Sequence, residues 1–145
     1  MTEGWRSNME LLFKHQVYTL VGAAFEVYNI LGPGFLEAVY QEALIVEFTQ
    51  RQIPFVAHQE IRITYKGHQL SKSYIPDFLC DNSIIVEIKA TERLTPTDQA
   101  QLLNYMKAAQ LTTGLLINFG PAKNMEWKRM VLSQRPAPQL PAAAT

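Results

Sequence analysis

Apolar side chains recur at steps of three and four residues over the first fifty positions, which is the spacing of one face of a helix. Two such stretches predict helices over about residues 9–31 and 35–50, and Gly32-Pro33-Gly34 separates them. Glycine suits the position after a helix end and proline cannot continue a helix, so this tripeptide ends the first helix. The apolar positions are Phe13, Val17, Leu20, Val21, Ala24, Tyr28 and Leu31 in the first helix and Leu36, Val39, Tyr40, Ala43, Leu44 and Phe48 in the second.

Strand-like patterns follow the helices. Residues 61–65 alternate between apolar and polar positions, which predicts a half-buried strand, and residues 70–80 and 84–90 predict two more. Pro76 lies near the middle of the second strand, and because proline lacks the donor that a central strand needs, we expect an edge, a bulge or a bend there. The turn signals between these three antiparallel strands are Lys66-Gly67-His68 and Asp81-Asn82-Ser83.

A helix and an apolar strand complete the pattern. Thr95 suits the cap of a helix predicted over residues 95–109, and Pro96 suits its first position. Residues 115–119 are nearly all apolar, so strand, helix and strand predict a parallel pair with a right-handed crossover, covered on both faces. Residues 125–132 predict a further short edge strand or helix. The order of helix, helix, three strands, helix and strand predicts a small α/β fold.

Length and composition indicate one globular domain. The chain has 145 residues, and its 48% of hydrophobic and 18% of charged residues are ordinary for a folded protein. We expect a single domain over residues 1–134 and a disordered tail over residues 135–145. No apolar run approaches the roughly 18 residues that span a bilayer, and the first ten residues lack a signal-peptide pattern. With Cys80 as its single cysteine, we expect a soluble cytoplasmic protein with no disulfide and no membrane partner.

Charge is balanced overall but unevenly spread. Residues 1–60 hold three Lys or Arg and seven Glu, a net of −4, and residues 61–145 hold ten Lys or Arg and six acids, a net of +4. The basic second half fits a polyanion, but ordinary surface variation explains it equally well, and a zero net charge argues against strong non-specific binding to long nucleic acid. Arg62, Lys66 and Lys72 surround the first hairpin, where a solvated surface is the default and contact with a phosphate backbone is the alternative.

Three charged residues, Asp77, Glu87 and Lys89, lie in the otherwise apolar stretches 75–78 and 84–89. Glu87 and Lys89 are two residues apart on one strand, so they point to the same face. If residues 81–83 form a three-residue loop, Asp77 lies opposite Glu87 on that face, with Cβ atoms roughly 4.5–5.5 Å apart. A two-residue loop would instead place Asp77 opposite Ile88 and the two acids on opposite faces. The candidate site therefore depends on the length of this loop.

These residue types suit metal-assisted hydrolysis of a phosphodiester. Two close carboxylates repel unless a cation lies between them, and Mg²⁺, with Mn²⁺ as a substitute, takes oxygen ligands while keeping waters for chemistry. Lys89 can hold a phosphate oxygen or orient an attacking water. The alternative is a purely structural ion pair across the strands, in which Asp77 or Glu87 neutralises Lys89 on a solvated sheet face.

Several motifs resemble a known family. Gly34-Phe35-Leu36-Glu37-Ala38-Val39-Tyr40 is similar to the signature of the GxxExxY protein family, which is grouped with the PD-(D/E)XK nuclease-like superfamily. The resemblance runs from about Val21 to Phe119. It implies a restriction-endonuclease-like αβββαβ core, a mixed sheet flanked by helices, preceded by an extra N-terminal helix. The other matching motifs are Leu31-Gly32-Pro33-Gly34, Tyr74-Ile75-Pro76-Asp77-Phe78, Val86-Glu87-Ile88-Lys89, Gln101-Leu102-Leu103-Asn104-Tyr105 and Gly114-Leu115-Leu116-Ile117-Asn118-Phe119.

The resemblance also implies roles for individual residues of the site. Glu37 matches an acid on the helix before the sheet, which in such nucleases helps to hold the metal or its water. Asp77 and Glu87 match the two metal-binding acids. The carbonyl of Ile88 matches a further ligand, and Lys89 matches the catalytic lysine.

Further residues are assigned supporting or structural roles. Gln101 and Tyr105 match a supporting motif on the following helix and share one face because they are four residues apart. His58 and His68 flank the first strand without the spacing of a metal site, so we expect surface or turn histidines. Tyr40 is expected to pack in the core.

The resulting hypothesis is a Mg²⁺-dependent nuclease, a hydrolase that acts on DNA or RNA. The alternative is a catalytically inactive nuclease-like fold that serves as a binding or regulatory module. A domain of this size offers a nuclease little surface for gripping a duplex, so a homodimer or a protein partner would supply the rest.

Overall fold

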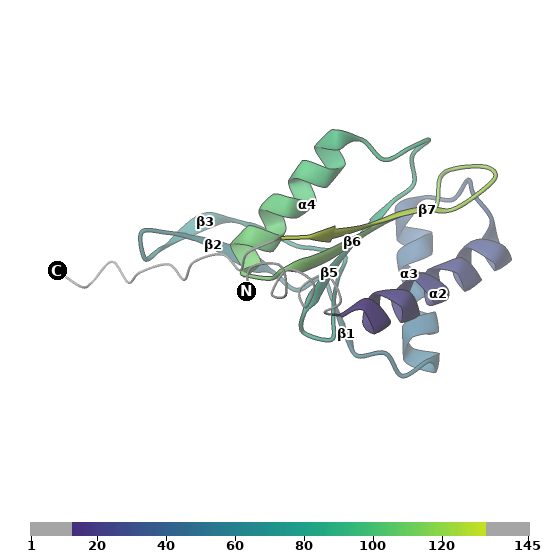
Figure 1. Cartoon of the computed structure of the whole chain (residues 1–145), viewed down its shortest axis with the longest axis horizontal. Helices are drawn as coiled ribbons and strands as arrows, with labels where there is room; N and C mark the ends of the chain where they lie inside the picture. The colour runs from purple at the N-terminus through teal and green to yellow at the C-terminus, as the bar shows by residue number, and fades with distance from the viewer. Residues whose placement is uncertain (1–12, 133–145) are drawn as a thin grey trace, which may run out of the picture.

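The computed structural model describes residues 13–132, which form a central five-stranded sheet with helices on both of its faces (Figure 1). The structure confirms the predicted α/β class, with a mixed sheet and a helix that precedes the core. The helices are α2 (Lys14–Leu31), α3 (Glu37–Gln50) and α4 (Pro96–Ala109). The strands of the sheet, in spatial order, are β1 (Phe55–Ala57), β4 (Phe78–Cys80), β5 (Ile84–Lys89), β6 (Thr113–Asn118) and β7 (Glu126–Val131).

The sheet combines parallel and antiparallel pairs. β5 and β6 are parallel neighbours joined through α4, which confirms the predicted strand, helix and strand unit. β1 pairs antiparallel with β4, β4 with β5, and β6 with β7. β7 is an edge strand, so the strand alternative for residues 125–132 is the correct one.

The strand predicted over residues 70–80 pairs antiparallel with both of its predicted neighbours, as expected, but it is not one continuous strand of a single sheet. Residues 70–80 are divided between β3 (His68–Tyr74) and β4, and β3 pairs with β2 (Ile61–Tyr65) in a separate two-stranded sheet. The short β1, which was not predicted, occupies the place beside β4. The division falls at Pro76, which has no N–H to offer a ladder, and the expected bend lies there.

The C-terminal end of α2 and the N-terminal end of α4 lie where the sequence predicted them. α2 ends at Leu31, and Gly32 follows with a φ of +71° while its N–H bonds to the carbonyl of Tyr28. The hydroxyl of Thr95 accepts a hydrogen bond from the N–H of Asp98, and the Asp98 carboxylate accepts one from the N–H of Thr95. This capping box satisfies two donors that a helix end would otherwise leave free, and it fixes the first turn of α4.

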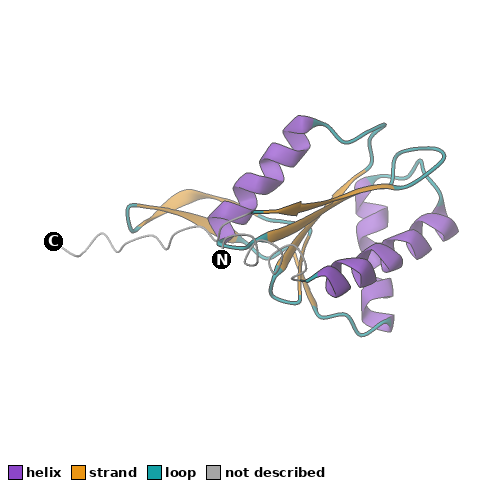
Figure 2. Ribbon diagram, in the orientation of Figure 1, coloured by secondary structure: helices purple, strands orange, loops and turns teal. Residues whose placement is uncertain are grey.

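Two hydrophobic clusters lie on opposite sides of the sheet, and Figure 2 shows α4 on one face and the α2–α3 pair on the other. Side chains of a strand alternate between faces, so Ile85 packs under α4 while its neighbours on β5 pack toward α2 and α3. Glu87 and Lys89 follow Ile85 at steps of two and therefore lie on the α4 face. The first cluster includes Leu20, Leu44, Phe48, Phe78, Ile84, Val86 and Ile88, and the second includes Ile85, Leu102, Met106 and Leu116.

Some sequence expectations concern parts of the chain beyond the described residues. They are residues 9–12 of the first helix, the domain boundary at residue 134 and the tail over residues 135–145. Within the described range, no helix is long and apolar enough to cross a membrane. Cys80 is buried there as a free thiol.

Candidate active site

The loop between β4 and β5 has the length on which the candidate site depends. Cys80 pairs with Ile84, so the loop consists of residues 81–83. Its first two residues adopt positive φ values of 52° and 54°, which Asp and Asn tolerate better than most residues. The same register, extended by one residue, sets Asp77 opposite Glu87. Of the two loop lengths that the sequence left open, the structure has the three-residue loop that the site requires.

Two hydrogen bonds interlock the opposed acids. The backbone N–H of Asp77 donates to Oε1 of Glu87 at 3.1 Å, and the backbone N–H of Ile88 donates to Oδ2 of Asp77 at 2.8 Å. The second of these bonds joins the Asp77 carboxylate to β5 at Ile88. It lies beside the bend at residues 75–77, where the chain passes from β3 to β4. Each bond uses one carboxylate oxygen and leaves the other for a further ligand.

Burial raises the pKa of both acids. The pKa of Glu87 rises from 4.5 to about 8, because burial disfavours its charged form and because Asp77 lies beside it. Burial also raises the pKa of Asp77, against the lowering effects of the Ile88 hydrogen bond, of His58 and of Lys89. A crowded pair of half-buried carboxyls favours the uptake of a proton or a cation, so this pair is chemically suited to a metal ion.

Lys89 lies on the same face as the acids and contacts α4. Its Nζ lies 3.9 Å from Oδ1 of Asp98, and the two side chains are 22% and 19% exposed. The charge of Lys89 lowers the pKa of both Asp77 and Glu87, so it acts on the acid pair. The sequence analysis assigned Asp98 only to the first turn of α4. Its position at the start of the helix that directly follows Lys89 could have indicated that it lies near that lysine.

A buried polar group fixes the chain after Lys89, and the sequence did not reveal it. Asn118 is fully buried at the end of β6, where its side chain accepts from the N–H of Thr91 and donates to the Thr91 carbonyl, both at 3.0 Å. It also donates to Oε1 of Glu126 at 3.1 Å, and that oxygen accepts from the N–H of Leu94 at 2.6 Å. The loop from Lys89 to α4 is therefore tied to β6 and β7.

Glu37 does not form a three-acid group with the other candidates. It is exposed as the first residue of α3, although its charge contributes to the raised pKa of Glu87. Between residues 13 and 132, no three His, Cys, Asp or Glu side chains are placed to hold a metal ion together. Ile88 contacts Asp77 through its amide, and the role of its carbonyl stays a prediction.

Tyr40 is a buried packing residue, as expected. Its hydroxyl donates to the carbonyl of Gly32 at 2.6 Å and accepts from the N–H of Phe35 at 3.2 Å. Its ring stacks on Phe119 with 4.4 Å between the ring centroids. These contacts fix the turn before α3, and so they fix the point at which Glu37 begins the helix.

Tyr105 contacts Tyr74, a residue near the acid pair for which the sequence predicted no role. Its ring stacks on Tyr74, at the end of β3, with 3.4 Å between centroids and 13° between planes. The Tyr74 hydroxyl is buried without a hydrogen-bond partner in the described part of the chain. Its pKa is raised by burial first and then by the charges of Glu87, Tyr105 and Asp77, so the two acids act on it electrostatically. Gln101 is exposed, and its supporting role stays a prediction.

His58 is exposed, as expected of a surface histidine, but it lies beside Asp77. Its backbone N–H donates to the Asp77 carbonyl at 3.3 Å, and its ring Nε2 lies 2.8 Å from Nε2 of Gln41. Gln41 also donates to the Asp77 carbonyl at 3.4 Å. These contacts join α3 to the bend before β4. Sequence spacing gave no signal for them, because Gln41 and Asp77 are 36 residues apart.

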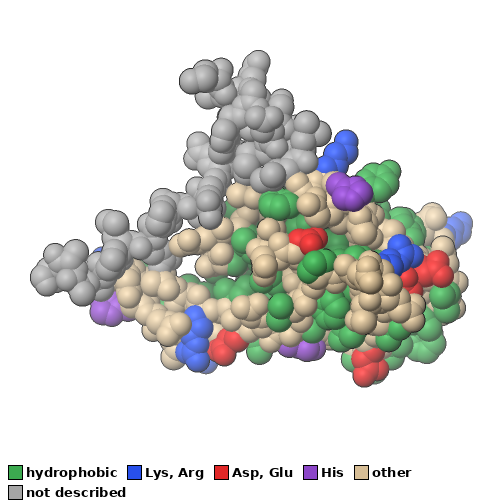
Figure 3. Space-filling view, turned by 90° about the horizontal axis from the view of Figure 1, so that it is seen from below, with side chains coloured by type: hydrophobic (Ala, Val, Ile, Leu, Met, Phe, Trp, Pro, Cys, Tyr) green, Lys and Arg blue, Asp and Glu red, His purple; other side chains and the backbone are tan. Residues whose placement is uncertain are grey.

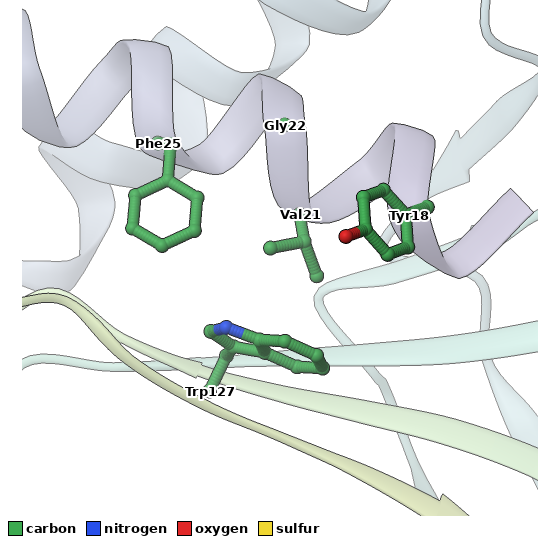
Figure 4. A pocket seen from close by; sticks show the side chains of 5 residues that line it. All are labelled: Tyr18, Val21, Gly22, Phe25 and Trp127. Carbon is green, nitrogen blue, oxygen red and sulfur yellow. The ribbon is translucent and has the colours of Figure 1, made fainter. Parts of the chain in front are cut away.

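A small apolar cavity lies elsewhere, between α2 and β7 (Figure 4). It has a volume of about 150 Å³ and is lined by Tyr18, Val21, Gly22, Phe25 and Trp127. None of the candidate site residues contributes to it, and its lining carries no charge. This cavity therefore lacks the charged groups that catalysis of hydrolysis requires, whereas the acid pair has them.

Comparison with known protein families agrees with this geometry. The family model described as PD-(D/E)XK nuclease superfamily matches residues 14–130, a range that includes every candidate site residue. Nucleases of this superfamily generally use divalent metals, and they act on nucleic acid. No curated protein and no solved structure matches the chain. Because the family model covers most of its length, this chain belongs to the PD-(D/E)XK nuclease superfamily.

Proposed function

We propose that this protein is a Mg²⁺-dependent nuclease that hydrolyses phosphodiester bonds in DNA or RNA. The observation that carries the proposal is the interlocked pair of Asp77 and Glu87, with Lys89 on the same face of the sheet. Membership of a nuclease superfamily supports the same chemistry.

The donor set suits Mg²⁺. Asp77 and Glu87 each keep one carboxylate oxygen outside the hydrogen bonds that join them. Mg²⁺ is usually held by one or two carboxylates together with waters and substrate phosphates, so two acids are enough. Mn²⁺ prefers the same oxygen ligands. When bound, the cation would polarise the phosphoryl oxygen and lower the pKa of a bound water.

The other candidate residues would act on the substrate or its water. Lys89 would hold a phosphate oxygen or orient the attacking water, and its ammonium would offset the negative charge that develops in the transition state. Glu37 would hold a water from the start of α3, and the carbonyl of Ile88 would add a ligand. Gln101 and Tyr105 would support the substrate from α4.

Cleavage by the full chain tests this proposal. Wild-type protein with single- and double-stranded DNA and RNA, in Mg²⁺ or Mn²⁺, should give products whose formation EDTA stops. Lys89→Ala and Asp77→Asn should each lower the rate by about 100-fold or more. Lys128→Ala, an equal loss of charge at an exposed position of β7, is the matched control and should leave the rate unchanged. Cleavage that survives both site variants would refute the assignment.

A second candidate is a nuclease-like module that binds without cleaving. The exposure of Glu37 favours it, because the third predicted acid does not meet the other two. Titration calorimetry separates the two functions. A nuclease should bind Mg²⁺ or Mn²⁺ at millimolar concentrations and lose that heat in Glu87→Gln, whereas an inactive module should show no such binding.

Several finer assignments belong to the same proposal. They are membership of the GxxExxY family, a single domain over residues 1–134, a cytoplasmic location, and a homodimer or protein partner that enlarges the grip on nucleic acid. The mass of the protein in solution, measured with and without nucleic acid, tests the last of these.

A further inference from the structure

β2 and β3 form an arm that projects from one end of the molecule (Figure 1). We name residues 61–74 the basic arm. Its strands are joined by Lys66 and Gly67, whose φ values of 49° and 77° fit the left-handed turn typical of tight hairpins. Residues 68–73 are all exposed, whereas Ile61 packs at the base of the arm against the α4 cluster. The outer part of the arm is therefore free to meet a partner.

The charged side chains of the basic arm are all positive. They are Arg62, Lys66 and Lys72, and Glu60 at the base pairs with Arg62 at 3.2 Å. Within residues 13–132, the ion pairs include neither Lys66 nor Lys72. Lys66 lies 5.5 Å over the ring of Tyr65, which is 60% exposed. Figure 3 shows basic side chains at the end of the molecule where the arm lies.

The basic arm leads directly to the acid pair. β3 ends at Tyr74, three residues before Asp77, and the stack of Tyr74 on Tyr105 fixes this end to α4. A strand of this length spans about 20 Å at roughly 3.3 Å per residue. That distance corresponds to about six base pairs of B-form DNA at roughly 3.4 Å each. A polymer bound along the arm would therefore reach the acids at its base.

We propose that the basic arm binds the phosphate backbone of double-stranded DNA on one side of the bond to be cleaved. Lys66 and Lys72 each contact one phosphate. This inference rests on the proposed nuclease function and names its substrate class. A two-stranded ribbon fits the major groove of B-form DNA, which is about 12 Å wide, whereas the deep and narrow major groove of duplex RNA excludes it.

The salt dependence of binding tests the arm. The full chain, in EDTA so that cleavage is stopped, is titrated against a DNA duplex, the matching single strand and the RNA duplex. Lys66→Asn combined with Lys72→Gln removes both charges with little risk to folding, because Asn before Gly favours this turn and position 72 is exposed. Each lost phosphate contact lowers the slope of log K against log salt by about 0.9. We expect a slope smaller by about 1.8 and binding about 30-fold weaker at 0.15 M salt.

Lys123→Gln combined with Lys128→Gln is the matched control, since it removes the same charge from β7 and the loop before it. This control should keep the wild-type slope. An equal loss in both double variants, or tighter wild-type binding to the single strand or to duplex RNA, would overturn the inference. If the wild-type protein cleaves nucleic acid but the arm variant binds DNA as tightly as the wild type, the inference about the arm is wrong and the proposed nuclease function stands. A wild-type protein that neither binds nor cleaves any nucleic acid would overturn the proposed function as well.

Discussion

The two hairpins of this protein follow each other in the sequence and lie in opposite environments. In the basic arm, residues 68–73 are exposed, and every charged group is positive. In the β4–β5 hairpin, Phe78 and Ile84 are fully buried, and the charged residues on the strand are Glu87 and Lys89. The hairpins also differ in their turns, since a two-residue turn closes the first and a three-residue loop closes the second.

This contrast shows that burial decides what a charge on a strand can do. On the arm, ammonium groups stay in water, where they attract a polyanion without a desolvation cost. On β5, burial raises the pKa of Glu87 to about 8, so the carboxyl takes up a proton or a cation. The exposed positive charges therefore lie on one hairpin and the half-buried acids on the next, and the bend at residues 75–77 joins the two.

The largest difference between the hairpins should appear in stability. Phe78 is fully buried, with the rings of Phe48 and Phe55 at 5.1 and 5.7 Å from its own. Phe78→Ala should lower the free energy of unfolding by about 3–5 kcal/mol, because it leaves a cavity. Leu70→Ala on the exposed β3 should change it by less than about 0.5 kcal/mol. Urea unfolding measures both, and equal losses would contradict the contrast.

The acid pair should make the metal-free protein less stable as the pH rises. The folded pKa of Glu87, about 8, lies above its ordinary value of 4.5, so the folded protein holds a proton that the unfolded chain has released between these values. The associated stability is fully present below pH 4.5 and is lost as the pH rises to about 8. The slope is at most about 1.4 kcal/mol per pH unit and is smaller near the two pKa values, so the loss between pH 5 and 8 should be about 3.5 kcal/mol.

Unfolding in EDTA across this pH range measures the loss. Glu87→Gln cannot release a proton and should flatten the profile. Glu60→Gln, at the exposed base of the basic arm, is the matched control and should keep the wild-type slope. Saturating Mg²⁺ should reverse the trend above pH 7, because a bound cation favours the charged acids. A wild-type profile without slope would show that the acids are ionised without a cation.

Local patterns predicted much of this structure. Periodicity and cap residues predicted the three helices, and the order of strand, helix and apolar strand predicted the parallel pair of β5 and β6. The turn residues 81–83 predicted a hairpin and left two registers open. A three-residue loop selects the register in which Asp77 and Glu87 share a face, and the sequence alone did not determine that length. β1 was not predictable, because its three residues are too few to show a period, and although Pro76 indicated a break, nothing in residues 61–74 indicated that they leave the central sheet.

Contacts between distant segments were beyond the reach of the sequence pattern. Asn118 and Thr91 are 27 residues apart and show no spacing that a period would reveal. Tyr74 was visible only as a neighbour of the Pro-Asp motif, and its stack on Tyr105 depends on how α4 crosses the sheet. The roles of Glu37, Gln101 and Lys89 in catalysis stay predictions that mutagenesis has to test.

Hydrogen bonds at the ends of the two hairpins should differ in strength. Asn118→Ala would remove the fully buried amide that binds both the N–H and the carbonyl of Thr91, and it should cost about 1–3 kcal/mol of unfolding free energy. Ser73→Ala removes an exposed hydrogen bond to Glu60, 2.7 Å long, and should cost less than about 0.5 kcal/mol. Thermal unfolding at neutral pH compares the two. An Asn118 variant as stable as the Ser73 variant would show that the hydrogen bonds between Asn118 and Thr91 contribute little to stability.

The smallest difference should lie between the two ion pairs. Lys89–Asp98 is 3.9 Å long with side chains 22% and 19% exposed, and Arg62–Glu60 is 3.2 Å long with side chains 44% and 47% exposed. Double-mutant cycles with Lys89→Gln and Asp98→Asn should give a coupling below about 1 kcal/mol, and cycles with Arg62→Gln and Glu60→Gln a smaller one. The side-chain carbonyl of asparagine at position 98 can still accept the hydrogen bond from the N–H of Thr95, so the capping box is kept and the cycle isolates the charge. A larger coupling on the arm would show that distance outweighs burial, and it would reverse the contrast between the hairpins.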